Sequence, residues 1–250
     1  MLYQLRHSSQ QLFARLASVI PCSCALCGMT NDAVVCSACH DRFFCAPQYR
    51  CTQCAAPVLE VAGTSDPRCG DCLKQPPAFD ATIVAADYAP PIDQLVLALK
   101  FGSRLALAPF FARLLRDASL RTQGHSFALP NQLIAIPLGA QRLAERGFNQ
   151  AVEIAKPLSR ALGVKLDPGF VRRERETHAQ ALLHPDERRK NIRGAFMVSQ
   201  HAIDRIRGQH IGVVDDVITT GETLHEMATT LKRFGAVRVT NFVFARTPQK

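Results

Sequence analysis

The amino-acid sequence predicts an α/β protein in which a parallel sheet, with helices on both of its faces, follows a small cysteine-rich domain. Two observations support this prediction. From residue 80 onward, apolar segments of strand length alternate with helical segments, as they do in proteins with a parallel sheet. Between residues 22 and 75, four Cys-x-x-Cys pairs follow one another in a stretch without a long periodic apolar segment. Such a stretch cannot bury enough apolar area to fold unaided.

The composition is that of an ordinary globular protein with an excess of positive charge. The 250 residues are 47% hydrophobic and 20% charged, which is enough for one sizeable core and a small accessory unit. The formal net charge of +9 favours anionic partners, either phosphorylated small molecules or nucleic acid. The alternative is that the lysines and arginines only solvate the surface.

Residues 1–21 are predicted to form an amphipathic helix, because apolar residues are interrupted there by arginines and other polar residues. Arg15 lies in the middle of this segment, which a secretory signal would not tolerate. No apolar run in the sequence reaches the length of about 18 residues that a membrane helix requires. We therefore expect a cytoplasmic protein without a membrane span, in which paired cysteines bind metal more often than they form disulfides.

Residues 22–75 are predicted to form a double zinc ribbon. Two tetrahedral zinc ions need eight thiolates, and consecutive pairs supply two sets of four. We assign one structural ion to the first two pairs and another to the last two. The eight predicted ligands are Cys24, Cys27, Cys36, Cys39, Cys51, Cys54, Cys69 and Cys72. Disulfides and an iron–sulfur cluster are the alternatives. Cys22 and Cys45 are expected not to be ligands, although Cys22 could replace Cys24.

Pro76-Pro77 predicts a rigid linker, so that the main domain spans residues 78–250. Its first half predicts two strands and three helices from the spacing of apolar residues. They are a strand at 81–88, a helix from Ile92 that ends at Lys100-Phe-Gly102, a helix from about Leu105 to Leu120, a buried strand at 132–138 and a helix after Gly139. Pro157 should kink this last helix or divide it in two.

Arg142 and Arg146 lie one helical turn apart at the start of the helix that follows Gly139. Cations at a helix amino terminus oppose the helix dipole, and an anion bound between them would relieve the conflict. The two arginines therefore predict a site for an anionic group, with surface solvation as the alternative.

Residues 171–193 are highly charged and weakly periodic, which predicts a mobile surface segment that can close over a site. Its basic residues would neutralise a pyrophosphate or contact a nucleic-acid backbone, and a solvated loop is the alternative. Strand character resumes at residues 196–198 and again at 237–244.

The segment that begins at Ile211 combines a strand with two acids. Its β-branched residues need burial on both faces, as in a parallel strand, whereas Asp215 and Asp216 cannot be buried unpaired. The acids are therefore expected at the exposed carboxyl end of the strand, where ligands bind in open α/β sheets.

An anion-binding loop is predicted directly after these acids. Thr219, Thr220 and Gly221 are small, and a helix is expected from Glu222 to Phe234. Backbone N–H groups at the start of such a helix can surround an anion. A phosphorylated sugar would offer hydroxyl groups to the acids and a phosphate to the loop.

Residues 213–223 read Val-Val-Asp-Asp-Val-Ile-Thr-Thr-Gly-Glu-Thr and resemble the phosphoribosyl pyrophosphate (PRPP) signature of type I phosphoribosyltransferases. An ordinary strand-to-helix turn capped by Asp or Thr is the alternative. The resemblance implies a type I phosphoribosyltransferase-like sheet. It also implies that Asp215 and Asp216 contact ribose hydroxyls, directly or through Mg²⁺. The residues that would enclose the 5-phosphate are Thr219, Thr220, Gly221 and Thr223.

Further motifs resemble those of the competence protein F (ComF)/GntX family. They are the cysteine pairs, Lys100-Phe-Gly102, Ile136-Pro-Leu138, Arg146-Gly-Phe-Asn-Gln150, Thr177-x-x-Gln180 and Arg189-x-Asn191. This resemblance implies a double zinc ribbon before a phosphoribosyltransferase-like domain. It implies that Arg142 and Arg146, and less directly Lys100, face pyrophosphate. Glu222 departs from many transferases of this fold, which have a small residue there.

Two functions follow from the resemblance. The first is a Mg²⁺-dependent phosphoribosyltransferase, which would replace the pyrophosphate on PRPP by an unidentified acceptor, in a protein linked to DNA uptake or the use of external DNA. The second is a non-catalytic module that senses PRPP and engages single-stranded DNA or a helicase-like protein of the uptake machinery. The absence of Trp weakens a single-strand reader based on base stacking.

Overall fold

The structure, a computed structural model, describes residues 22–46, 49–60, 66–122, 128–174 and 192–248. The chain divides into two compact units, Met1–Ala46 and Pro47–Lys250, and each is described by itself. The amphipathic helix expected at residues 1–21 lies outside the described residues. In the described part of the chain, no helix combines the length and the apolar character needed to cross a membrane.

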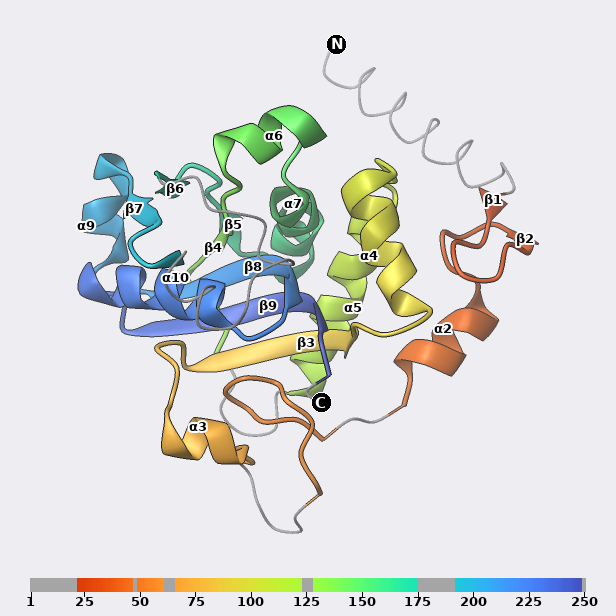
Figure 1. Cartoon of the computed structure of the whole chain (residues 1–250), viewed down its shortest axis with the longest axis horizontal. Helices are drawn as coiled ribbons and strands as arrows, with labels where there is room; N and C mark the ends of the chain where they lie inside the picture. The colour runs from red at the N-terminus through yellow and green to blue at the C-terminus, as the bar shows by residue number, and fades with distance from the viewer. Residues whose placement is uncertain (1–21, 47–48, 61–65, 123–127, 175–191, 249–250) are drawn as a thin grey trace, which may run out of the picture. The chain divides into compact units, whose positions relative to one another are not determined.

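The smaller unit holds the first four of the predicted zinc ligands. Its strands β1 (Cys22–Ser23) and β2 (Thr30–Asn31) pair antiparallel, and helix α2 (Ser37–Phe44) follows (Figure 1). Gly28 closes the turn between the two strands with a φ of 75°, a backbone conformation that favours glycine. The turn brings Cys24 and Cys27 toward the start of α2.

The larger unit is built on a five-stranded sheet in which every pair of neighbouring strands is parallel. The strand order is β3-β9-β8-β4-β5. The strands are β3 (Ala81–Asp87), β4 (Gln132–Ala135), β5 (Lys165–Leu166), β8 (His210–Ile218) and β9 (Arg238–Arg246). This architecture confirms the predicted parallel sheet, although β4 ends at Ala135 and is shorter than expected.

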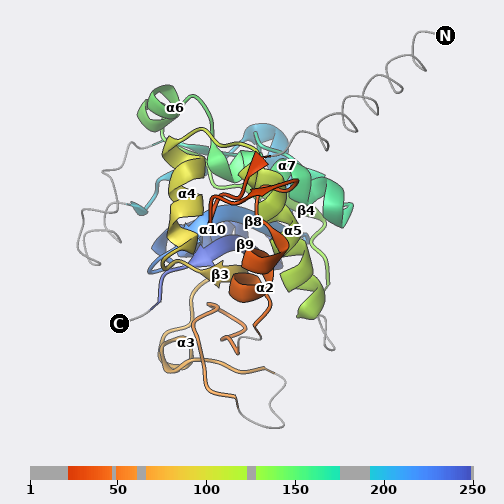
Figure 2. The ribbon, with the colours of Figure 1, turned by 90° about the vertical axis from the view of Figure 1, so that its right-hand side faces the viewer.

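Helices lie on both faces of this sheet because the order in which the chain adds strands changes direction across the sheet. The helices are α4 (Ile92–Phe101), α5 (Leu107–Arg121), α6 (Ala140–Arg146), α7 (Gln150–Leu162) and α10 (Glu222–Arg233). From β3 to β4 and on to β5 the chain moves toward one edge of the sheet, whereas from β8 to β9 it moves back. Since such crossovers are right-handed, α5 and α7 cover one face and α10 covers the other (Figures 1 and 2).

The core lies on both faces of the sheet, where α5 and α7 pack on one face and α10 on the other. Phe111 of α5 stacks on Phe244 of β9, with ring centroids 3.5 Å apart, and both side chains are fully buried. This packing fixes the position of the central strands. As a result, the ends of β4 and β8 are held side by side at one edge of the sheet.

The helical segment after Gly139 is divided, but not at the predicted place. Its break between α6 and α7 lies at Gly147, which has a φ of 78°, and Asn149 caps α7 by accepting from Ala151 N at 2.9 Å. Pro157 lies inside α7. A left-handed glycine followed by an Asn cap ends one helix and starts the next. Of the two effects expected of Pro157, a kink or a division, the division was therefore wrong.

A two-stranded antiparallel ribbon flanks the sheet on the side of α10. It consists of β6 (Val171–Arg173) and β7 (Phe196–Val198), and the short helices η2 (Gln200–Ala202) and α9 (Ile203–Ile206) follow it. Residues 175–191 between these strands lie outside the described residues. They include most of the charged segment and the motifs Thr177-x-x-Gln180 and Arg189-x-Asn191, so their mobility and their roles stay predictions.

The second group of cysteine pairs is part of the larger unit, Pro47–Lys250. The reason is a set of direct bonds to the sheet. Thr52 O accepts from Thr82 N of β3 at 3.1 Å, and Arg50 Nη2 lies 2.8 Å from Asp87 Oδ1. Helix α3 (Gly70–Lys74) carries Cys72, the last of the predicted ligands.

Candidate functional site

A cavity of about 730 Å³ opens at the carboxyl edge of the sheet, beside the ends of β4 and β8. The chain leaves β4 in one direction and β8 in the other, so a topological switch point lies between them. Ligands of open α/β sheets bind at such points. Eight of the nine predicted ligand-binding residues line the cavity. They are Lys100, Arg142, Arg146, Asp215, Asp216, Thr219, Gly221 and Thr223.

The two acids lie on the part of β8 that extends beyond β4. The last residue pair between these strands is Ala135 with Val214, so the next residues of β8 are paired with β9 alone. Asp215 is half-buried, whereas Asp216 is buried with an exposed fraction of 3%. The expectation of two acids at an exposed strand end is therefore wrong for Asp216, because β8 continues through both acids to Ile218.

Asp216 is buried together with a cation. Lys100 Nζ, at the end of α4, lies 2.6 Å from Asp216 Oδ2. This pairing satisfies the requirement that a buried carboxylate has a partner. Lys100 was assigned to the pyrophosphate pole, and in this structure it lies instead against one of the acids.

Asp215 has an altered acidity. Burial, reinforced by the negative charge of the neighbouring Asp216, raises the pKa of Asp215 well above its ordinary value. The backbone N–H of Asp216, which donates to Asp215 Oδ1 at 2.8 Å, and the ammonium group of Lys100 lower this pKa and oppose the shift. Perturbed carboxyl groups in a cavity are candidates for binding or catalysis.

The predicted phosphate loop connects β8 to α10. Gly221 has a φ of 86° and precedes the first residue of α10, so its backbone turns sharply where the helix begins. Thr219, Gly221 and Thr223 line the cavity, together with Glu222. Thr220 is exposed and lines a neighbouring cavity of about 700 Å³. The structure therefore brings all of the loop to the main cavity except Thr220.

Arg142 and Arg146, both on α6, also line the cavity. Arg146 is the last residue of this short helix, so the argument from the helix amino terminus applies to Arg142 only. The guanidinium carbon of Arg146 lies 5.2 Å from the centre of the Phe101 ring, and Arg146 also donates to Gln150. Burial and the nearby Arg142 charge lower the pKa of Arg146, while Asp216 raises it.

The first group of four cysteines converges on one point in the smaller unit. The sulfur atoms of Cys24, Cys27, Cys36 and Cys39 all lie within 4.8 Å of one another. The distance between Cys27 Sγ and Cys36 Sγ is 3.8 Å, the separation of about 3.8 Å expected for ligands of a tetrahedral ion with Zn–S bonds of about 2.3 Å. Backbone N–H groups of Leu26 and Cys36 lie 3.4 Å from Cys24 Sγ.

The second group has the same arrangement in the larger unit. Cys51, Cys54, Cys69 and Cys72 also place their sulfur atoms within 4.8 Å of one another. Each set of four sulfurs matches the donor number and chemistry of a structural zinc site. Cys22 lies outside both groups and donates from Sγ to Ala33 O at 3.2 Å.

Known relatives are found for nearly the whole chain. DNA utilization protein YhgH from Escherichia coli O6:H1 is 37% identical over 234 residues, which cover 91% of this chain and 98% of that protein. The chain belongs to the competence protein F (ComF) family. Competence protein F from Haemophilus influenzae is 32% identical to this ComF-family chain over 216 residues, which cover 85% of it and 90% of the relative.

A phosphoribosyl transferase domain is recognised in this ComF-family chain at residues 149–250. The match includes both acids and the predicted phosphate loop, whereas Lys100, Arg142 and Arg146 precede it. Among solved structures, the chain is similar to adenine phosphoribosyltransferase from Thermoanaerobacter pseudethanolicus, with 18% identity and a TM-score of 0.33 over 58% of this chain and 83% of that one.

The cavity of the ComF-family chain also contains residues to which the sequence analysis assigned no binding role. Tyr88, Phe101 and Arg173 line it, and Phe101 is 73% exposed. Arg173 belongs to the charged segment, whose basic residues were considered only as a group. Phe101 belongs to the motif Lys100-Phe-Gly102, but the exposure of its ring could not be predicted, because the same apolar spacing also describes a buried position.

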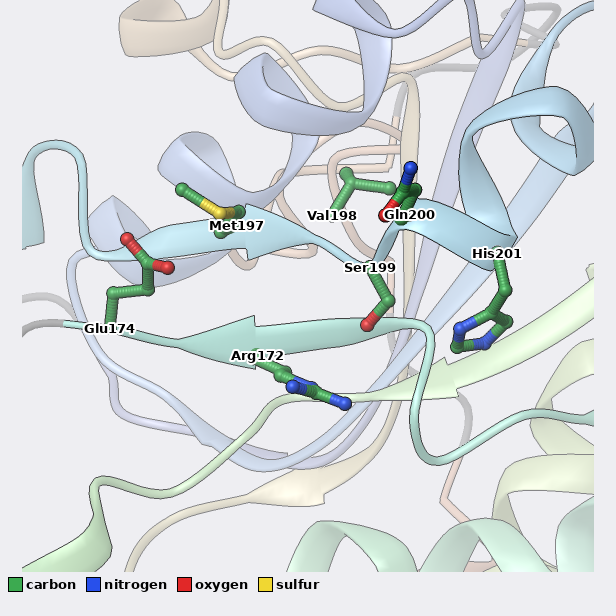
Figure 3. Close-up of a pocket in the computed structure, with 7 residues that line it drawn as sticks. All are labelled: Arg172, Glu174, Met197, Val198, Ser199, Gln200 and His201. Carbon is green, nitrogen blue, oxygen red and sulfur yellow. The ribbon is translucent and has the colours of Figure 1, made fainter.

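A further cavity of about 620 Å³ lies on the ribbon of β6 and β7 (Figure 3). Its lining includes Arg172, Met197 and His201, and none of the predicted site residues. The acids, the predicted phosphate loop and the two arginines meet in the cavity at the sheet edge. That cavity is therefore the candidate functional site of this ComF-family chain.

Proposed function

We propose that this protein binds PRPP together with Mg²⁺ in the cavity at the carboxyl edge of the sheet. The observation that carries the proposal is that Asp215, Asp216, the phosphate loop and the Arg142–Arg146 pair line one cavity at a topological switch point. PRPP has a phosphate at one end, a pyrophosphate at the other and hydroxyl groups between them. The lining has the complementary groups.

Each group of the cavity has a separate task in this proposal. The backbone and hydroxyl groups at 219–223 bind the 5-phosphate at the start of α10. Asp215 and Asp216 bind the ribose hydroxyls, directly or through the metal ion. Arg142 and Arg146 neutralise the pyrophosphate, for which guanidinium groups are suited.

A divalent cation fits the chemistry of this donor set. Asp215 and Asp216 provide hard oxygen ligands, and Lys100 already places a positive charge on Asp216. When bound, Mg²⁺ supplies positive charge that stabilises a departing pyrophosphate. The residues of the chain orient the ribose and hold the two charged ends of the ligand apart. Such a site would serve transfer of the phosphoribosyl group to an acceptor.

We also propose two structural zinc ions, one in each group of four cysteines. The matched sulfur positions in both groups support this assignment. Elemental analysis of protein purified in reducing, chelator-free buffer is expected to find about two zinc ions per chain. The absence of metal under those conditions would contradict the zinc assignment, and iron would favour an iron–sulfur cluster.

The names of the relatives and the net charge of +9 support a role in DNA use, with single-stranded DNA or a helicase-like protein of the uptake machinery as the partner. We place that role in the cytoplasm. If the cavity senses PRPP without turnover, the protein is a regulatory module. Release of pyrophosphate when candidate acceptors are added would decide in favour of an enzyme.

Calorimetry of PRPP in the presence of Mg²⁺ tests the binding proposal. The unaltered protein is expected to bind PRPP, and the double variant Asp215→Asn/Asp216→Asn is expected not to bind. His201→Asn is the control: His201 lines the other cavity, on the ribbon of β6 and β7, so this variant should bind PRPP like the unaltered protein. Equal binding by the unaltered protein and the double variant would overturn the assignment of the acids.

A further inference from the structure

The second cysteine cluster is bonded directly to residues that support the phosphate loop. Within the turn that joins two of its ligands, Gln53 Nε2 donates to Phe79 O at 3.0 Å, and Cys54 O accepts from Arg246 Nη1 at 2.7 Å. Gln53, Cys54, Phe79 and Arg246 are all buried. Buried hydrogen bonds of this kind are costly to break, because each partner is left without water.

The first of these bonds reaches the loop through the ring of Phe79. A Cβ atom added to Gly221 would lie 3.8 Å from Phe79 Cζ and 3.6 Å from Ile218 Cδ1. Phe79 is 1% exposed, so its ring is fixed between the cysteine cluster and the loop. A shift of the Cys51–Cys54 turn therefore moves the support of Gly221.

The second bond reaches the loop along paired strands. Arg246 is the last residue of β9 and lies opposite Ile218, the last residue of β8. Thr247 N donates to Ile218 O at 2.9 Å, which extends this pairing by one more bond. Ile218 immediately precedes Thr219, so Arg246 holds the strand end from which the loop departs.

Arg246 also makes the stability of this strand end depend on whether the cysteine cluster holds a metal ion. Its side chain is 2% exposed, and a guanidinium group stays charged in a protein. A buried charge needs a compensating charge. A zinc ion with four thiolates carries a net charge of −2, since the ion contributes +2 and the thiolates −4.

We propose that the second cysteine cluster positions the phosphate loop, so that metal binding by Cys51, Cys54, Cys69 and Cys72 increases the affinity of the cavity for a ribose phosphate. Gln53 and Arg246 are the positioning residues that transmit this effect. The inference rests on the proposed function of the cavity. The first cysteine cluster belongs to the other compact unit, and the proposal assigns it no part in this coupling.

Two cluster variants of the full chain separate this coupling from a general effect of metal loss. Cys51→Ser/Cys54→Ser is expected to lose one metal ion and roughly tenfold in PRPP affinity, measured by calorimetry with Mg²⁺. Cys27→Ser/Cys36→Ser is expected to lose one metal ion and to change PRPP affinity by about twofold at most. Cys22→Ser, outside every candidate metal-binding group of the described residues, controls for the substitution itself. Equal PRPP affinity in the two cluster variants would overturn the proposal.

Variants that keep every thiol test the positioning residues. Gln53→Ala and Arg246→Gln are expected to retain both metal ions and to lose roughly threefold or more in PRPP affinity. In both variants, amide hydrogen exchange at residues 219–224 is expected to become faster while the core helix α5 stays protected. Arg246→Lys, which keeps the buried charge, should recover part of the affinity. Unchanged exchange at 219–224 in both variants would contradict the coupling.

The exchange measurement also separates a failure of this inference from a failure of the proposed function. If the unaltered chain does not bind PRPP, the proposed function of the cavity is wrong. Faster exchange at residues 219–224 in Cys51→Ser/Cys54→Ser, but not in Cys27→Ser/Cys36→Ser, would still support the coupling. The same exchange in both cluster variants would overturn it.

Discussion

Lys100 Nζ lies 2.6 Å from Asp216 Oδ2, and this ion pair joins the end of α4 to the acids of the cavity. The Asp216 side chain is 5% exposed and the Lys100 side chain 21%. The ammonium group therefore provides the positive charge that a bound Mg²⁺ would bring to the same carboxylate. A ligand that carries Mg²⁺ to Asp216 has to compete with Lys100.

Replacement of Lys100 tests this competition. Lys100→Met leaves the Asp216 carboxylate buried without its cation, and we expect the free energy of unfolding to fall by about 3 kcal/mol. Millimolar Mg²⁺ is expected to restore part of the loss, because the ion replaces the missing charge. Urea unfolding with and without Mg²⁺ measures both effects.

A second lysine provides the matched control for this experiment. Lys156 forms an exposed ion pair with Glu153 on α7, and the Lys156 side chain is 50% exposed. Lys156→Met is expected to change stability by about 0.5 kcal/mol or less, with or without Mg²⁺. A loss in Lys100→Met that Mg²⁺ does not reduce would contradict a metal position at Asp216.

The raised pKa of Asp215 predicts how ligand binding depends on pH. Burial and the neighbouring Asp216 charge favour the protonated form of Asp215. Since metal and ribose binding need the ionised carboxylate, PRPP affinity should increase as the pH rises through the raised pKa. An ordinary aspartate, with a pKa of about 3.9, would show this increase at lower pH.

Calorimetry over a series of pH values measures this dependence, with the same series run on Asp215→Glu as the comparison. The native state holds the Asp215 proton more tightly than the unfolded state, so this group lowers the stability of the free protein as the pH rises. A PRPP affinity that falls with rising pH across the range where Asp215 ionises would contradict its assignment.

The local order of strand, acids, loop and helix could be predicted from the sequence because each step has a local cause. The helix expected at residues 222–234 is α10, which ends at Arg233, and the strand expected from His210 is β8. Apolar spacing and helix-ending glycines act within a few residues. These signals place the acids and the loop next to each other in the chain.

The contacts that complete the site could not be predicted, since they join residues far apart in the sequence. Arg246 and Cys54 are separated by 192 positions, and neither has a local pattern that points to the other. The pairing of Lys100 with Asp216 likewise depends on how α4 meets the end of β8. The sequence shows which charged residues the chain has, but only the fold shows which of them form ion pairs.

His210 predicts a loss of stability in mild acid. It is buried at the start of β8, and its Nε2 lies 2.8 Å from Thr240 Oγ1. Burial, together with the nearby Arg238 charge, lowers the pKa of His210 to about 4. The unfolded chain binds this proton at a pH of about 6.5, so the stabilising effect is present above that pH and is lost as the pH falls toward about 4.

The size of this effect follows from the two pKa values. We expect His210 to account for a loss of about 3 kcal/mol between these pH values. Urea unfolding of the unaltered protein and of His210→Gln, measured as a function of pH, isolates it. Glutamine does not titrate, so the curve of the variant should be flatter in this window. Parallel curves would show that His210 does not titrate differently in the folded state.

The sheet leaves no room for a side chain at Gly212. A Cβ atom there would lie 2.5 Å from Leu133 Cδ2 and 2.8 Å from Pro130 Cγ. Leu133 is fully buried and cannot move away freely, so Gly212→Ala is expected to lower the free energy of unfolding by about 1–3 kcal/mol. Gly169→Ala is the control, because its nearest neighbour is Asp167 Oδ1 at 3.7 Å. Thermal unfolding of both variants measures their difference in stability. Equal stability of the two variants would contradict the clash, because it would mean that β4 and β8 can move apart to make room for a methyl group. Since the cavity opens beside the ends of these two strands, Gly212→Ala should also weaken PRPP binding.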